Sequence, residues 1–170
     1  MACCVLDVGG WIFPRGNLVL DIRTPNNGTV EHYVIGDACH MPFREKCFSR
    51  IESHGSLNYF SSDISFFHEV RRTLRENGIL MISANTYYSL TINLIKVLLN
   101  NPKGSLRLIL NTIRRRYRWY SPRTLQRALE KGGLTTFRIY PNVSLYWRPT
   151  RTPHNLLAIA NKPYKSGRLL

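Results

Sequence analysis

The chain has 170 residues, of which 44% are hydrophobic, a length and composition that fit one globular domain and exclude a disordered polypeptide. No apolar run approaches the roughly 18 residues that a membrane-spanning helix needs. Asp7 interrupts the short apolar stretch at the N-terminus, which argues against a signal peptide. The four cysteines lack a CxxC spacing, so we expect core residues in a reducing, cytoplasmic compartment and no metal site.

The positive charge is confined to one end of the sequence. The formal net charge is +14, and residues 101–170 hold 15 Lys and Arg against one acid, so this segment alone accounts for 15 − 1 = +14. Such asymmetry predicts a polyanionic partner, with nucleic acid first and an anionic membrane surface second. A solvated basic face, or a composition bias of the source organism, is the alternative interpretation.

Three short apolar runs open the chain, near residues 3–8, 17–22 and 31–36. Apolar runs of this length between Gly, Pro and Asn are typical of buried strands in parallel sheets. Each run is associated with an acid: Asp7, Asp21 and Asp37. Ligands of open α/β sheets lie outside the carboxyl ends of the strands, so the three carboxylates are expected around one crevice.

The rest of the chain alternates between strand and helix patterns. A helix near 62–76 is predicted from apolar residues at helical spacing, with Ser62 or Asp63 as its cap. Ser121-Pro122 predicts the start of another helix, which ends at Gly132-Gly133. The other expected elements are strands near 48–54, 79–83, 134–140 and 156–160, and two helices within 87–118.

Five segments, in order, resemble the class I S-adenosylmethionine-dependent methyltransferases, type 11-like. They are Val5-Leu6-Asp7-Val8-Gly9-Gly10, Gly36-Asp37-Ala38-Cys39-His40-Met41-Pro42-Phe43, Cys47-Phe48-Ser49-Arg50-Ile51-Glu52-Ser53, the run from Phe67 to Ile82, and Leu125 to Leu134. The resemblance implies an α/β, Rossmann-like three-layer sandwich. Its seven-stranded, mostly parallel sheet has the order 3-2-1-4-5-7-6, with the last strand antiparallel. Residues 1–170 would form a single domain with a helical, lid-like insertion at about 85–120.

The same resemblance implies S-adenosylmethionine as cofactor and assigns residues to its parts. Asp21 would accept hydrogen bonds from the ribose hydroxyls, and Asp37 would bind the adenine amino group. The Ala38 backbone N–H would meet the adenine ring, and backbone groups of Ser53 would border the reacting methyl. The remaining cofactor residues would be Gly9 and Gly10, which would pass beneath the methionine part, and Asp7, which would lie nearby. Loop capping or structural anchoring is the alternative role for the three acids.

The first loop departs from the family pattern. About eight residues, from Gly9 to Gly16, separate the first two strands, where a parallel crossover usually needs at least 10–12. The third glycine of the usual pattern is replaced by bulky residues. Either a loop replaces the crossover helix, which we favour because Asp21 still ends the second strand, or the cofactor site is degenerate.

His54 is the candidate catalytic base, because it follows the fourth strand where the acceptor would lie. Methyl transfer depends mainly on alignment of the nucleophile, so a structural histidine is the alternative. In the insertion, a run of arginines is interleaved with tyrosines and a tryptophan, and the candidate contacts are Arg114, Arg115, Arg116, Arg118 and Trp119. This pattern suits phosphates and stacked bases, and equally a membrane surface, a lid, or a homodimer contact.

Three classes of function remain open from the sequence. The first is a methyltransferase whose acceptor could be nucleic acid. The second is a non-catalytic relative that acts as a basic nucleic-acid-binding or regulatory partner. The third, a dinucleotide enzyme, is disfavoured because no GxGxxG precedes a helix.

Overall fold

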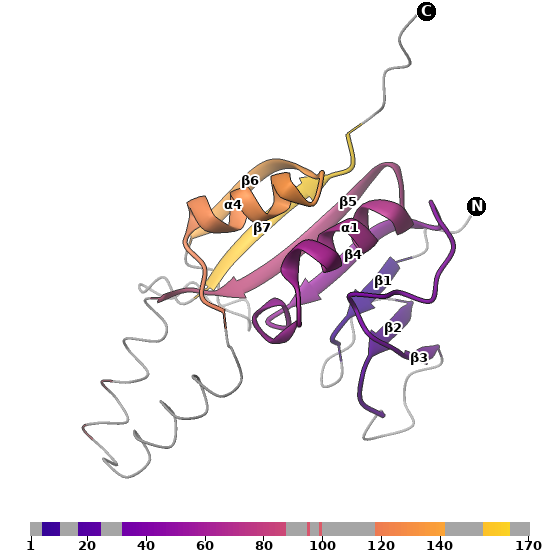
Figure 1. The fold of residues 1–170 in the computed structure, drawn as a ribbon, viewed down its shortest axis with the longest axis horizontal. Helices are drawn as coiled ribbons and strands as arrows, with labels where there is room; N and C mark the ends of the chain where they lie inside the picture. The colour runs from indigo at the N-terminus through magenta and orange to yellow at the C-terminus, as the bar shows by residue number, and fades with distance from the viewer. Residues whose placement is uncertain are drawn as a thin grey trace, which may run out of the picture.

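The computed structural model describes residues 5–10, 17–24, 32–87, 118–141 and 155–163, together with positions 95 and 99. These residues form one seven-stranded sheet in the order β3-β2-β1-β4-β5-β7-β6 (Figure 1). The order is the one predicted from the resemblance. No helix in the described part of the chain is long and apolar enough to cross a membrane.

The first half of the sheet consists of parallel strands. Its members are β1 (Val5–Val8), β2 (Leu18–Asp21), β3 (Tyr33–Ile35) and β4 (Phe48–His54). β1 pairs in parallel with both β2 and β4, and β2 pairs in parallel with β3. The short connection of residues 9–17 therefore joins two parallel strands rather than the arms of a hairpin. This pairing confirms the first part of the topology prediction.

The second half of the sheet contains the reversal of direction. β5 (Leu74–Asn85) is parallel to β4, whereas β7 (Asn155–Asn161) is antiparallel to both β5 and β6 (Thr135–Pro141). The last strand of the chain is thus the antiparallel one, as predicted. Strand β7 lies between β5 and β6, which places it inside the sheet, and its alternating buried residues Leu156, Ala158 and Ala160 face the core.

Two helices pack on one face of the sheet. These are α1 (Asp63–Thr73) and α4 (Pro122–Lys131), and Figure 1 shows them on the same side. The Ser62 hydroxyl accepts from the Ser65 N–H at the start of α1, which resolves the expected cap in favour of Ser62. Ser121 caps α4, with Pro122 in its first turn and Gly132 after its end, as predicted.

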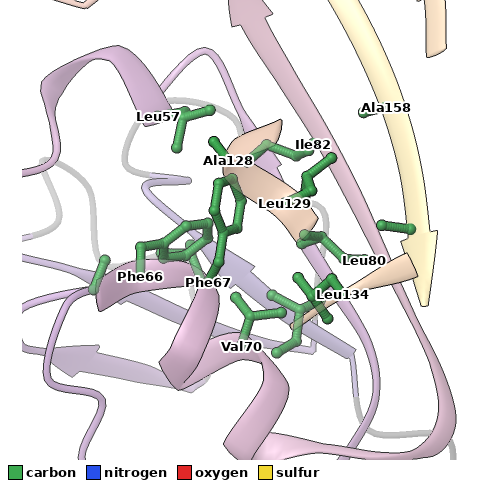
Figure 2. Packing of buried hydrophobic residues seen from close by; sticks show 14 of the residues in the cluster. Leu57, Phe66, Phe67, Val70, Leu80, Ile82, Ala128, Leu129, Leu134 and Ala158 are labelled. Atoms are coloured by element: carbon green, nitrogen blue, oxygen red, sulfur yellow. The ribbon is translucent and has the colours of Figure 1, made fainter. Parts of the chain in front are cut away.

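The core lies between these helices and the sheet. Phe66, Phe67 and Val70 of α1 meet Leu129 of α4 over Leu80 and Ile82 of β5, and all six side chains have no exposed surface (Figure 2). Along β5 and β7 the buried residues that face the helices recur at every second position, as expected for strands. Burial on this face fixes the register, and therefore the edge at which the predicted site residues meet.

Some predicted boundaries differ from the structure. Helix α1 ends at Thr73 rather than near 76, because Leu74 is extended and buried and pairs with Phe48 of β4. Asn77, at φ 60°, and Gly78 then form an irregularity within β5 rather than a helix end. The second helical layer of the predicted sandwich and most of the insertion at about 85–120 lie outside the described residues, so both stay predictions.

Candidate cofactor and active site

The carboxyl ends of β1, β2, β3 and β4 form one continuous edge. The Gly9 N–H donates to the Leu20 carbonyl (2.8 Å) and the Gly36 N–H to the Asp21 carbonyl (2.9 Å). From the other side, the Ser56 hydroxyl donates to the Gly9 carbonyl (3.1 Å). The loops after the four strands are therefore bonded together, and the predicted site residues gather along this edge.

The glycine loop after β1 is closely packed. Gly9 has φ 79°, a left-handed conformation that favours glycine, and a side chain there would collide with the Ser56 side chain. A side chain at Gly10 would collide with the Asp7 carboxylate, which is buried beneath it with Asp7 only 2% exposed. Asp7 thus lies under the loop, and both glycines are required by contacts within the chain.

Asp21 ends β2 at the predicted ribose position. One carboxylate oxygen, Oδ1, accepts from the Arg23 N–H (3.0 Å). Within the described part of the chain no donor reaches its other oxygen. Asp21 is only partly buried, so a ribose hydroxyl could bind that oxygen without displacing the loop.

Asp37 and Ala38 follow β3 and form a tight turn. Asp37 Oδ1 accepts from the Cys39 N–H (2.9 Å), and Oδ2 lies 3.2 Å from the His40 Nδ1. The Cys39 N–H, and after it the His40 side chain, hold the pKa of Asp37 below its ordinary value. The Ala38 N–H donates to no acceptor among the described residues, which leaves it available to a ring nitrogen of adenine.

The end of β4 carries a polar group of three side chains. His54 Nε2 lies 3.3 Å from Glu52 Oε2, and Arg50 Nε lies 2.9 Å from Glu52 Oε1. The three residues alternate along the strand, so they share the face opposite the core. Glu52 is only 7% exposed. Ser53 faces the core instead, with its hydroxyl buried and no hydrogen-bond partner in the part of the chain that is described.

Sequence reasoning missed Glu52 as a partner of the candidate base. Two residues before His54 on the same strand, it lies on the same face and fixes the orientation of the imidazole ring. The strand period of two is the signal that could have identified it. Asp7 pairs directly with Glu52 across β1 and β4, so the carboxylate-rich face continues toward the glycine loop.

The basic segment is described only at its end. Arg118 donates to the carbonyls of Phe60 (3.2 Å) and Ser61 (2.7 Å), and its guanidinium lies 3.8 Å from Asp63. Trp119 is partly buried. Arg114, Arg115 and Arg116 lie outside the described residues. The guanidinium of Arg118 is therefore occupied within the chain, whereas the other predicted anion contacts stay predictions.

A second residue that the sequence did not single out is Asn58, in the 3-10 turn η1 (Leu57–Tyr59) that follows β4. Its amide donates to the carbonyls of Asn85 and Arg118 and accepts from the Asn85 N–H. Asn58 is 1% exposed. It thus ties the turn beside the candidate site to both ends of the insertion, which also meet in a bridge between Thr86 and Tyr120.

Residues 19–82 match the family model of the methyltransferase domain. No curated protein sequence matches the chain. Because the match includes β2, β3, β4, α1 and most of β5, it covers the acids at 21 and 37 and the polar group on β4.

Solved structures share the fold over nearly the whole chain. A Haloferax volcanii protein in complex with the Trm112 methyltransferase activator superimposes with a TM-score of 0.65 at 14% identity, covering 94% of this chain and 82% of that one. An S-adenosylmethionine-dependent methyltransferase from Mesorhizobium loti gives 0.62 at 14% identity, with 93% and 90% covered. The [4+2]-cyclase SpnF gives 0.57 at 12% identity, with 94% and 74% covered.

Residues 19–82 are therefore similar to the methyltransferase domain, and the solved structures show that the chain shares the fold of S-adenosylmethionine-dependent methyltransferases. The cyclase shows that the same fold also serves another reaction, so the chemistry of this chain must be argued from its site.

Two carboxylates predict acid sensitivity: Asp37, and Glu69 of α1, which accepts from the Met41 N–H four residues after Asp37 (2.8 Å). Hydrogen bonds from Arg72 lower the pKa of Glu69, and the Cys39 N–H lowers that of Asp37. Because both pKa values lie below those of the unfolded chain, the stability they contribute is complete above the ordinary carboxyl range and is lost as the pH falls through the lowered values. We expect the melting temperature to decrease as the pH is lowered below about 4. Glu69→Gln should flatten this fall in a pH series of thermal melts, and an unchanged profile would contradict the assignment.

Proposed function

We propose that this protein transfers the methyl group of S-adenosylmethionine to an acceptor held beside the end of β4. The observation that carries the proposal is the arrangement of Asp21, Asp37 and the Ala38 N–H along one edge of the sheet. Two acceptors and one donor lie there in the order that a ribose and an adenine would need. The Ala38 N–H and one oxygen of Asp21 have no partner among the described residues, which supports a bound nucleoside.

The residues present fit the cofactor. Asp21 would hold the ribose hydroxyls, and Asp37 and Ala38 would read the 6-amino group and a ring nitrogen. Gly9 and Gly10 would allow the methionine part to lie close to the backbone, because neither residue carries a side chain. When bound, S-adenosylmethionine supplies an electrophilic methyl group on a sulfonium centre.

His54 and Glu52 provide a base and its orienting partner. Glu52 is itself held by Arg50 at 2.9 Å, so the His54 ring has a fixed direction at the end of β4. An acceptor whose nucleophile must lose a proton would give it to His54. For an acceptor that is already deprotonated, the site would contribute orientation and exclusion of water instead.

Calorimetry with S-adenosylhomocysteine tests the proposal. We expect wild type to bind, and Asp21→Ala and Asp37→Ala each to weaken binding by about 1.5–3 kcal/mol, the usual contribution of a hydrogen bond to a charged group. Glu130→Ala, on the far helix α4, is the control and should bind as wild type does. Unchanged affinity in both site variants, with intact folds, would show that these carboxylates are only structural.

Wild type that fails to bind would favour the second candidate, a non-catalytic relative that acts as a basic nucleic-acid-binding or regulatory partner. The observation behind this candidate is the connection of residues 9–17, which is short for a parallel crossover. The Haloferax volcanii neighbour, which is bound to an activator protein, gives a precedent for partnership on this fold.

The acceptor class follows from the charge. Residues 101–170 carry the whole net charge of +14. Of this segment, Tyr120 forms a bridge with Thr86, the residue that follows β5. We propose a nucleic acid as acceptor, in a cytoplasmic setting; a lipid headgroup or a small anion is the alternative. The salt dependence of nucleic-acid binding separates these acceptors.

A further inference from the structure

The segment that carries Asp37 and Ala38 has no regular structure of its own. It joins the parallel strands β3 and β4 through residues 36–47, none of which is in a helix or a strand. A crossover of this kind usually contains a helix that satisfies its own backbone groups. Here the backbone of the segment needs partners from elsewhere in the chain.

Two side chains of α1 supply them. The Glu69 Oε2 accepts from the Met41 N–H (2.8 Å), and Arg72 donates to the carbonyls of Met41 (2.9 Å) and Phe43 (2.7 Å). The two side chains are also joined to each other, by Arg72 Nε to Glu69 Oε1 (2.9 Å) and Arg72 Nη2 to Glu69 Oε2 (2.7 Å). Each bond includes a charged group, which makes it stronger than a neutral one.

The other end of the segment is held by the start of the same helix. The Cys39 thiol donates to the Ser62 carbonyl (3.2 Å), and Cys39 is 3% exposed. Asp37 and Ala38 directly precede these anchored residues. The position of α1 therefore decides where the Asp37 carboxylate and the Ala38 N–H lie relative to β3.

We infer that Glu69 and Arg72 are positioning residues that set the selectivity of the site for a 6-aminopurine. The inference rests on the proposed function. Asp37 accepts from an amino group and Ala38 donates to an unprotonated ring nitrogen, whereas a 6-oxopurine presents the opposite pattern at both atoms. Selectivity then depends on a fixed separation between the Asp37 carboxylate and the Ala38 N–H. Arg72 and its carboxylate partner Glu69 maintain this separation, because together they hold the backbone of the segment.

The test compares S-adenosylhomocysteine with S-inosylhomocysteine by calorimetry on the full chain. Wild type should prefer the adenine compound by at least about tenfold, the equivalent of one well-placed hydrogen bond. In Glu69→Ala the ratio of the two affinities should fall to about a third of its wild-type value or less, because the segment loses the carboxylate that aligns Arg72. Arg72→Lys should lower it too, since a lysine cannot donate to both carbonyls in the same fork. Glu69→Gln serves if the alanine variant does not fold.

Glu76→Ala is the matched control. It removes a carboxylate paired with Lys46 (3.2 Å) and Lys162 (3.5 Å), so it also loses ion pairs but touches nothing in residues 36–43. It should keep the wild-type ratio even where its stability falls as much as that of Glu69→Ala. A ratio that Glu69→Ala and Arg72→Lys leave unchanged would overturn the inference while the proposed function stands. A wild type that binds neither compound would overturn both.

Discussion

Replacing Asn58 by alanine should lower the free energy of unfolding by about 2–4 kcal/mol, because three hydrogen bonds are lost and two backbone groups are left without a partner. These two groups are the Asn85 N–H and the Arg118 carbonyl, whereas the Asn85 carbonyl keeps the Tyr120 N–H (3.2 Å). For a chain of this size we expect the melting temperature to fall by about 2–4 °C for each kcal/mol. Urea unfolding measured by circular dichroism gives the free energy directly.

Gln126→Ala is the control for the loss of an amide side chain. Gln126 is exposed on α4 and donates to Glu130 (2.9 Å), so its removal should change stability by less than about 0.5 kcal/mol. Asn58→Asp keeps the shape and the acceptor but loses both donated hydrogen bonds, and we expect it to be at least as damaging as alanine. Equal stability of Asn58→Ala and Gln126→Ala would show that the turn and the ends of the insertion hold together without Asn58.

Changing Arg114, Arg115 and Arg116 together to glutamine should greatly lower the affinity for RNA or DNA. If each arginine neutralises one phosphate, the slope of log affinity against log salt should become shallower by about 2–3. Arg118→Gln should leave the slope nearly unchanged, because its guanidinium is engaged by Phe60, Ser61 and Asp63. Fluorescence anisotropy over a salt series distinguishes the two variants.

Trp119→Ala separates stacking from charge. It should reduce affinity by about 1–3 kcal/mol without altering the salt slope, since stacking on a base releases no counterions. Binding of S-adenosylhomocysteine should be the same in all of these variants. If wild type binds nucleic acid no better than the triple variant at about 0.1 M salt, the basic segment serves a membrane or protein partner and the proposed acceptor is wrong.

The sequence was sufficient for the order of the sheet through its resemblance to a known family. The short apolar runs alternating with helical spacing, and the two final strands without a helix between them, agree with parallel crossovers followed by an antiparallel pair. The positions of Asp21 and Asp37 follow as well, because each stands at the end of an apolar run. The caps of the helices at Ser62 and Ser121 are local hydrogen-bonding motifs and are equally visible in the sequence.

Tertiary structure decided the partners of these residues. Glu69 and Arg72 appear in the sequence as an ordinary exposed pair on a helix, and only the packing of α1 beside residues 41–43 turns them toward that backbone. Asn58 contacts residues 27 and 60 positions away in the chain. Such contacts depend on the strand register and on the approach of distant segments, and these are set by burial of the whole sheet face rather than by local pattern. Arg118 shows this difference most clearly. The basic run predicts it as a phosphate contact, but its guanidinium donates to the Ser61 carbonyl of the chain itself.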